Sequence, residues 1–175
     1  MKRYILFFTL IALTVWQTFG AELGLSDNEK NSATNEWGPV NYYTQISIGI
    51  NGAKTTFGTN EDVEMLVRVR NLSTNNDYGL YVQEPFTFSD GFKFVVISPT
   101  GKDISPPFHK SFRFTGGVVW VKTNQVDGFR VDLGQICKLN EVGSYKIVLK
   151  MKRWSPDRKT AYEIDSNPLN IVVTP

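Results

Sequence analysis

The chain has 175 residues, of which 41% are hydrophobic, 21% charged and 13% aromatic, and this composition excludes a disordered, collagen-like or coiled-coil protein. Its single cysteine also excludes a small disulfide-rich fold. The formal net charge is +2, from 19 Lys and Arg against 17 Asp and Glu. Two of the bases, Lys2 and Arg3, lie in a segment expected to be cleaved, and without them the count is 17 against 17. A neutral chain gives no electrostatic reason to expect nucleic acid or an anionic membrane as a partner.

The first 20 residues have the pattern of a secretory signal peptide. Basic Lys2 and Arg3 precede an uncharged apolar run from Tyr4 to Trp16, and Gly20 is small enough for a cleavage pocket. The run is shorter than the ~20 residues that a membrane-spanning helix needs, which favours cleavage over a retained anchor. We therefore predict a signal peptide over 1–20, a secreted or periplasmic mature chain, and no transmembrane segment in that chain.

The mature chain divides into a polar leader and one domain. Residues 21–36 contain few large apolar side chains, so burial cannot offset the entropy of ordering them, and a mobile leader is predicted. From Trp37 onward, short segments of alternating polarity are separated by Gly, Pro, Asn or Asp at intervals of about eight to twelve residues, a spacing typical of an all-β sandwich. Residues 37–175 are predicted to form one such domain of eight or nine strands.

The strands are predicted from alternation and from turn residues. In segment 63–70 the apolar residues alternate with charged ones, with Leu66 as the exception, which predicts one core face and one face in water. Segment 46–50 alternates in the same way and ends at Asn51-Gly52, a turn sequence. Segment 92–97 is apolar on both faces and is predicted to be a central strand, closed into a hairpin by 99–102. Further strands are predicted at 78–82, 118–122, 129–133, 145–151, 162–164 and 169–173, with one helical turn at 133–137.

Tyr145 carries the most information about the fold. In Greek-key sandwiches a tyrosine at the start of a late strand bonds through its hydroxyl to a backbone group a few residues upstream, an arrangement called the tyrosine corner. Gly143, two residues earlier, allows the chain to turn without a Cβ clash. The role expected for both residues is structural.

Several phrases, taken together, resemble the immunoglobulin-like sandwich modules of secreted or periplasmic bacterial proteins. They are EWGPV at 36–40, GTNEDVEMLVRVRN at 58–71, FKFVVISPTGK at 92–102, VGSYKI at 142–147 and SNPLNIVV at 166–173. The resemblance implies an exported immunoglobulin-like Greek-key β-sandwich. The chain is also loosely similar to small bacterial proteinase inhibitors built on the same sandwich, but no stretch matches an inhibitory loop, so no functional residue is carried over.

The inventory of reactive groups is poor for an enzyme. The chain has one histidine, His109, in a loop, and one cysteine, Cys137, in a short apolar turn without the sequence that surrounds thiol-protease nucleophiles. The adjacent Asn60, Glu61 and Asp62 lack the alternating carboxylates of calcium loops, which favours a solvated turn over a metal site. No catalytic residue, metal site or cofactor is predicted.

Two surface features are candidates for binding. The loop after segment 145–151 carries Trp154 among the basic residues Lys150, Lys152, Arg153, Arg158 and Lys159, an arrangement that can dock an anionic partner or stack on a sugar or base. The alternative is a charged edge that prevents aggregation between sheets. Phe108, Phe112 and Phe114 form either an apolar patch or satellite packing beneath their own loop.

These observations favour a secreted, non-enzymatic module that binds another protein through its end loops or a free sheet edge. The predicted partner-binding residues are Trp154, Arg153, Arg158 and Lys159. One alternative is a proteinase inhibitor that presents a rigid extended loop to a protease. The other is a carbohydrate-binding module with exposed coplanar aromatic rings, or an enzyme with His109 or a pair of carboxylates in a pocket.

Overall fold

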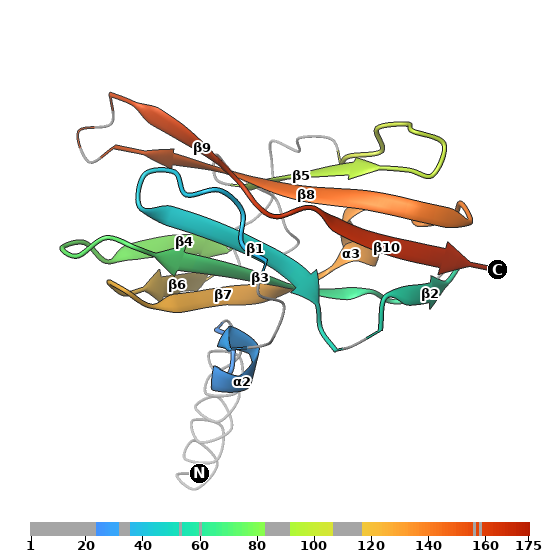
Figure 1. Ribbon diagram of the computed structural model, residues 1–175, viewed down its shortest axis with the longest axis horizontal. Helices are drawn as coiled ribbons and strands as arrows, with labels where there is room; N and C mark the ends of the chain where they lie inside the picture. The colour runs from blue at the N-terminus through green and yellow to red at the C-terminus, as the bar shows by residue number, and fades with distance from the viewer. Residues whose placement is uncertain are drawn as a thin grey trace, which may run out of the picture.

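The computed structural model describes residues 24–31, 36–52, 54–59, 61–82, 92–106, 117–155, 157 and 159–175 (Figure 1). The elements in chain order are α2 (Asp27–Lys30), β1 (Thr44–Ile50), β2 (Thr56–Gly58), β3 (Glu64–Asn71), β4 (Tyr78–Val82), β5 (Phe92–Ile97), β6 (Gly117–Val121), β7 (Val126–Asp132), α3 (Leu133–Ile136), β8 (Gly143–Trp154), β9 (Ala161–Asp165) and β10 (Leu169–Thr174). The all-β class is confirmed. Residues 1–20, where a signal peptide is predicted, lie outside the described residues, and no helix within the described residues is long and apolar enough to cross a bilayer.

Two sheets face each other across a shared core (Figure 1). Sheet A has the strand order β1-β3-β7, and sheet B has the order β2-β10-β8-β5, with β9 paired to the end of β8. Neighbouring strands are antiparallel except β2 and β10, which run parallel. Strands β4 and β6 form a separate antiparallel ribbon, sheet C, in which β6 lies beside β7.

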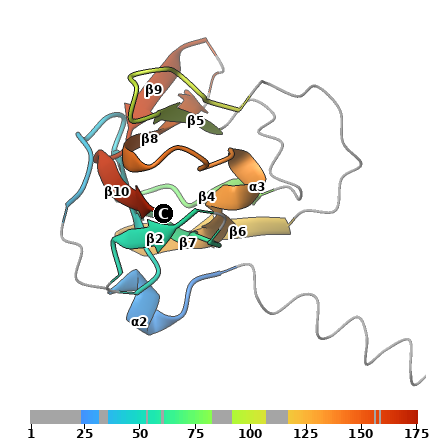
Figure 2. The same ribbon diagram turned by 90° about the vertical axis from the view of Figure 1, so that its right-hand side faces the viewer.

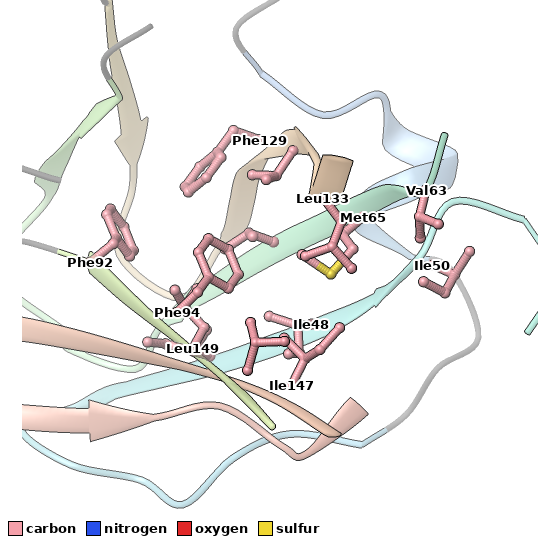
Figure 3. Close-up of a cluster of buried hydrophobic side chains, with 14 of the residues drawn as sticks. Ile48, Ile50, Val63, Met65, Phe92, Phe94, Phe129, Leu133, Ile147 and Leu149 are labelled. Atoms are coloured by element: carbon pink, nitrogen blue, oxygen red, sulfur yellow. The ribbon is translucent and has the colours of Figure 1, made fainter. Parts of the chain in front are cut away.

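Alternate positions in both sheets supply the core. Ile48 and Met65 of sheet A and Phe94 and Leu149 of sheet B are fully buried, and Figure 3 shows them pointing toward one another from the two layers. Burial of each such side chain stabilises the fold by about 1.5–3 kcal/mol relative to leaving it exposed. The core therefore stabilises the domain without help from an intramolecular disulfide, which a chain with one cysteine cannot form.

The strand positions agree with the sequence pattern except at two places. The prediction omitted β2, whose three residues are too few to show alternation. Strand β5 was predicted to be central, but among the described residues it ends the order of sheet B. The chain then folds back along its outer side, where the Ile104 N–H donates to the Val96 carbonyl at 2.9 Å. Apolar residues on both faces of a strand indicate that both faces are buried. They do not show whether a neighbouring strand is hydrogen-bonded to each of its edges.

The outer side of β3 was predicted to face water, and this prediction is wrong for the middle of the strand, while Glu64 at its start is exposed. Arg68 is 2% exposed and Leu66 is 3% exposed, both on that side. Trp37, from the segment before β1, lies over it with the ring centroid 5.5 Å from the guanidinium carbon of Arg68 and 4.1 Å from that of Arg70. The Nη2 of Arg68 donates to the Ser47 hydroxyl at 2.8 Å, and burial lowers the pKa of Arg68. Sheet A is thus covered on both faces.

The second cover over sheet A comes from the segment predicted to be a mobile leader. Residues 24–31 of that segment instead carry α2, which Figure 2 shows beneath the sheet that contains β7. Leu25 is 4% exposed. Glu29 accepts two hydrogen bonds from Arg130, at 2.7 and 2.6 Å, and Lys30 lies 3.1 Å from Asp127. One buried leucine and two ion pairs with β7 attach α2 to sheet A, and the polar composition of the segment did not predict these contacts.

The tyrosine corner has the geometry that the sequence predicts. Tyr145 is fully buried at the start of β8, and its hydroxyl accepts a hydrogen bond from the Glu141 N–H at 2.8 Å. Burial, as the largest cause, raises the pKa of Tyr145. Gly143 has φ +135°, and a Cβ added there would lie 2.7 Å from Pro99 Cβ. Both the positive φ and the lack of room beside Pro99 therefore require glycine at this position.

Candidate binding surface

The β8–β9 hairpin carries three of the predicted partner-binding residues, Arg153, Trp154 and Lys159, at one end of the molecule (Figure 1). Successive side chains of β8 alternate between the two faces of sheet B, so Lys150, Lys152 and Trp154 lie on the outer face. Trp154 is 46% exposed, and the Nζ of Lys152 lies 4.7 Å from its ring centroid. Trp154 is therefore an exposed aromatic ring with a cation held against it.

Hydrogen bonds join the described residues of the segment between β8 and β9. The Ser155 N–H donates to the Thr160 carbonyl at 2.8 Å, and the Thr160 N–H donates to the Ser155 hydroxyl at 3.0 Å. Asp157 accepts from the Ser155 hydroxyl at 2.5 Å and from the Lys159 N–H at 3.2 Å, and these bonds lower the pKa of Asp157. Lys159 is exposed here, whereas Arg158, also predicted to bind the partner, lies outside the described residues.

Arg153 lies on the opposite face of β8 from Trp154 and contacts the protein's own turn before β1. Its Nη1 donates to the Thr44 hydroxyl and, at 3.4 Å, to the Tyr42 carbonyl. Its guanidinium carbon lies 5.2 Å from the Tyr42 ring centroid. The sequence placed Arg153 among the partner-binding residues, but in the structure it positions a neighbouring turn.

That turn presents a residue that sequence reasoning missed, Tyr43. Asn41 and Thr44 close the turn with reciprocal backbone hydrogen bonds of 3.0 Å, and its two central residues, Tyr42 and Tyr43, have φ +45° and +56°. This left-handed conformation costs about 1–2 kcal/mol for each residue other than glycine. Tyr42 stacks on Tyr162 with the ring centroids 4.1 Å apart and the planes inclined by 11°.

Tyr43 is 62% exposed, so two strained positions hold an aromatic side chain in solvent. The sequence signal was the adjacent Tyr42-Tyr43 between Asn41 and Thr44, in a place where a tight turn normally takes Asn-Gly. It was missed because neither residue is a turn former. The presence of two tyrosines there, at a cost in backbone energy, points to a role for their side chains.

The positive charge of the hairpin is partly neutralised. Lys150 lies 2.7 Å from Glu163 and 3.1 Å from Asp165. These hydrogen bonds, with Glu163 the larger contributor, raise the pKa of Lys150, and the bond from Lys150 lowers the pKa of Glu163. Lys152 takes part in none of the ion pairs found among the described residues.

The remaining chemical candidates contribute little to this surface. Cys137 is 9% exposed, and burial raises the pKa of its thiol to about 11, so it is protonated at neutral pH and is a poor nucleophile. Glu61 bonds to the Lys54 ammonium and the Gly58 N–H, as expected of a solvated turn. Within the described part of the chain no three His, Cys, Asp or Glu side chains cluster as metal ligands. His109, Phe108, Phe112, Phe114 and Asn60 lie outside the described residues.

Comparison with known proteins gives no family. No family model and no curated protein matches the chain. Among solved structures, it is similar to a mutant β-glucosidase from Listeria innocua in complex with laminaribiose, with 10% identity, a TM-score of 0.36, and coverage of 79% of this chain and 17% of the other. A second structure of β-glucosidase from Listeria innocua, in complex with glucose, gives 11% identity, a TM-score of 0.32, and coverage of 74% and 17%. Likeness at this level supports no inference about fold or activity, and the chain spans about one sixth of those proteins.

Proposed function

We propose that this protein is a secreted or periplasmic, non-enzymatic immunoglobulin-like module that binds another protein through the end at which the β8–β9 hairpin and the Asn41–Thr44 turn meet. The observation that carries the proposal is the exposure of Tyr43 and Trp154, 62% and 46% respectively, on a hydrogen-bonded turn and at the end of a paired strand. Tyrosine and tryptophan on pre-ordered backbone are the side chains that dominate the energy of protein interfaces.

The strand order supports the immunoglobulin-like part of the proposal. Such folds place strands A, B and E in one sheet and C, F and G in the other. The orders β1-β3-β7 and β10-β8-β5 correspond to A-B-E and G-F-C. The buried Tyr145 then lies near the start of the F strand, after the E–F connection through α3, where the tyrosine corner belongs. The β8–β9 hairpin becomes part of the F–G connection, which in antibody domains is a binding loop.

The two alternatives receive less support from the geometry. A sugar platform needs free aromatic faces, but Tyr42 and Tyr162 stack on each other, and Lys152 lies against the Trp154 ring. An inhibitor needs an extended loop that enters a protease cleft, whereas the Asn41–Thr44 segment is a tight turn closed by two backbone hydrogen bonds. We therefore favour a protein–protein contact at this end of the domain.

The test is an affinity capture followed by a direct binding measurement. The mature chain from Ala21 to Pro175 serves as bait against extracellular and periplasmic extract of the source organism, and the captured protein is purified and titrated calorimetrically. We expect Tyr43→Ala and Trp154→Ala to weaken binding by about tenfold or more each. Trp120→Ala is the matched control, because Trp120 is 63% exposed on β6 in a different sheet. Equal affinity of all three variants, or loss of binding in the control alone, would place the interface elsewhere.

A further inference from the structure

We propose that the partner of this module presents an acidic protein surface, and that the outer face of sheet B binds it, from Lys93 and Lys146 up to Trp154. The inference rests on the proposed function and adds to it the chemistry of the partner and the extent of the contact.

The outer face of sheet B carries more positive than negative charge. Alternation along the strands places Lys93 of β5 and Lys146, Lys150 and Lys152 of β8 on this face. The carboxylates that the described strands of sheet B place there are Glu163 and Asp165 of β9, two against four lysines. Since the mature chain has 17 acidic and 17 basic residues, this excess is a local concentration of charge and does not follow from the average composition.

Pairing leaves three of the four lysines open to a partner. Glu163 and Asp165 both bind Lys150, at 2.7 and 3.1 Å. None of the ion pairs among the described residues involves Lys93, Lys146 or Lys152. Lys93 lies directly across from Lys150 in the β5–β8 register, and Glu163 and Asp165 offset the repulsion between these two like charges. Lys93, Lys146 and Lys152 are therefore the lysines that carboxylates of a partner would meet.

The apolar residues on the same face favour a protein over a highly charged polymer. Val95 and Val148 face each other across β5 and β8 and are half-buried, while Trp154 lies at the end of the same face. A protein surface can cover these side chains and gain from their burial. Phosphate recognition, by contrast, favours the forked guanidinium of arginine, and the described strands of sheet B place no arginine on this face, because Arg153 lies on the other side of β8.

The test uses a defined acidic polypeptide as probe. Poly-L-glutamate is titrated into the ¹⁵N-labelled mature chain, with heparin as a second probe, and amide and Trp indole shifts are followed by NMR. We expect the shifts to concentrate at Lys93, Lys146, Lys152 and Trp154, and the affinity to fall about tenfold between about 0.05 and 0.5 M NaCl. Lys146→Glu and Lys152→Glu are each expected to weaken binding by about five- to tenfold. Lys122→Glu makes the same charge change at an exposed site after β6 and serves as the matched control.

Three results would overturn the inference. They are shifts that lie outside the outer face of sheet B, an equal loss of affinity in Lys122→Glu, and tighter binding of heparin than of poly-L-glutamate through the same lysines. The proposed function is tested separately. If the captured partner loses affinity for Tyr43→Ala but binds Lys146→Glu and Lys152→Glu like the unaltered chain, the acidic-partner inference fails while the protein-binding function stands.

Discussion

The side-chain amide of Asn167 pairs with both backbone polar groups of Ile48, accepting from its N–H at 2.8 Å and donating to its carbonyl at 3.0 Å. Asn167 lies between β9 and β10, whereas Ile48 lies in β1, so the contact joins the two sheets. The preceding Ser166 accepts from the Leu149 N–H through its hydroxyl at 2.9 Å. The Ser-Asn-Pro phrase thus satisfies backbone groups of β1 and β8 at the point where the chain enters its last strand.

Loss of the Asn167 amide should destabilise the domain strongly. Asn167→Ala leaves the N–H and carbonyl of Ile48 buried without these partners, and we expect a cost of about 2–4 kcal/mol in the free energy of unfolding. Urea denaturation measures it. Asn170→Ala, at an exposed position of β10, is the control and should stay within about 0.5 kcal/mol of the unaltered chain. An equally small change for Asn167→Ala would mean that water or a backbone shift replaces the amide.

The tyrosine corner predicts a smaller and more specific effect. Tyr145→Phe keeps the buried ring but removes the acceptor of the Glu141 N–H, so we expect a loss of about 1–2 kcal/mol in the free energy of unfolding. Thermal and urea unfolding should give the same value for this loss in the free energy of unfolding. In Tyr43→Phe, which removes the hydroxyl of a 62% exposed side chain, stability should be unchanged. Similar stabilities of the two variants would show that the Tyr145 hydroxyl has no structural role.

The sequence predicted those parts of the fold that depend on local pattern. Alternation located β1 and β3, and the spacing of Gly143 and Tyr145 predicted the corner, because in each case neighbouring residues carry the whole signal. The cover over the outer face of sheet A was missed. It depends on contacts of Trp37 with Arg68 and Arg70, residues more than thirty positions apart, and a charged residue in a strand is normally a mark of solvent.

At the candidate site the sequence identified the hairpin but not the role of each residue. Trp154 was predicted to be exposed, and it is. Arg153, one position earlier, points to the other face, which alternation along β8 could have indicated. Tyr43 was not a candidate, because its exposure follows from a backbone conformation that tyrosine rarely adopts and that no propensity predicts.

Acid should weaken the docking of α2 on sheet A. Hydrogen bonds from Arg130, and then from Ser26, lower the pKa of Glu29 from 4.5 to about 2. A carboxyl whose pKa is lower in the folded state stabilises above its ordinary pKa and loses this contribution as the pH falls from about 4.5 to about 2. We therefore expect the amide signals of Leu25 and Lys30 to be constant between pH 6 and 8 and to move below pH 4.5 in a ¹⁵N NMR titration.

A variant at neutral pH separates this carboxyl from general acid effects. Glu29→Gln at pH 6 should reproduce the low-pH positions of those amides and weaken docking of α2 by about 1 kcal/mol, the scale of a partly exposed ion pair. Glu61→Gln is the control, because Glu61 is also ion-paired, with Lys54, but lies outside α2 and β7. If Glu29→Gln leaves the α2 signals in place, Leu25 and the Lys30–Asp127 pair hold the helix without Glu29.

The strained turn before β1 predicts opposite effects on stability and binding. Tyr43 has φ +56°, a left-handed conformation that is strained for tyrosine but not for glycine. In Tyr43→Gly the relief of this strain outweighs the greater entropy that glycine has in the unfolded chain. We therefore expect the free energy of unfolding to rise by about 0.5–1 kcal/mol. The same change removes the exposed ring and should weaken binding to the captured partner by about tenfold or more. Urea denaturation and calorimetric titration on one sample measure both. A variant that loses stability would identify Tyr43 as part of the fold, and a more stable variant with unchanged affinity would remove it from the interface.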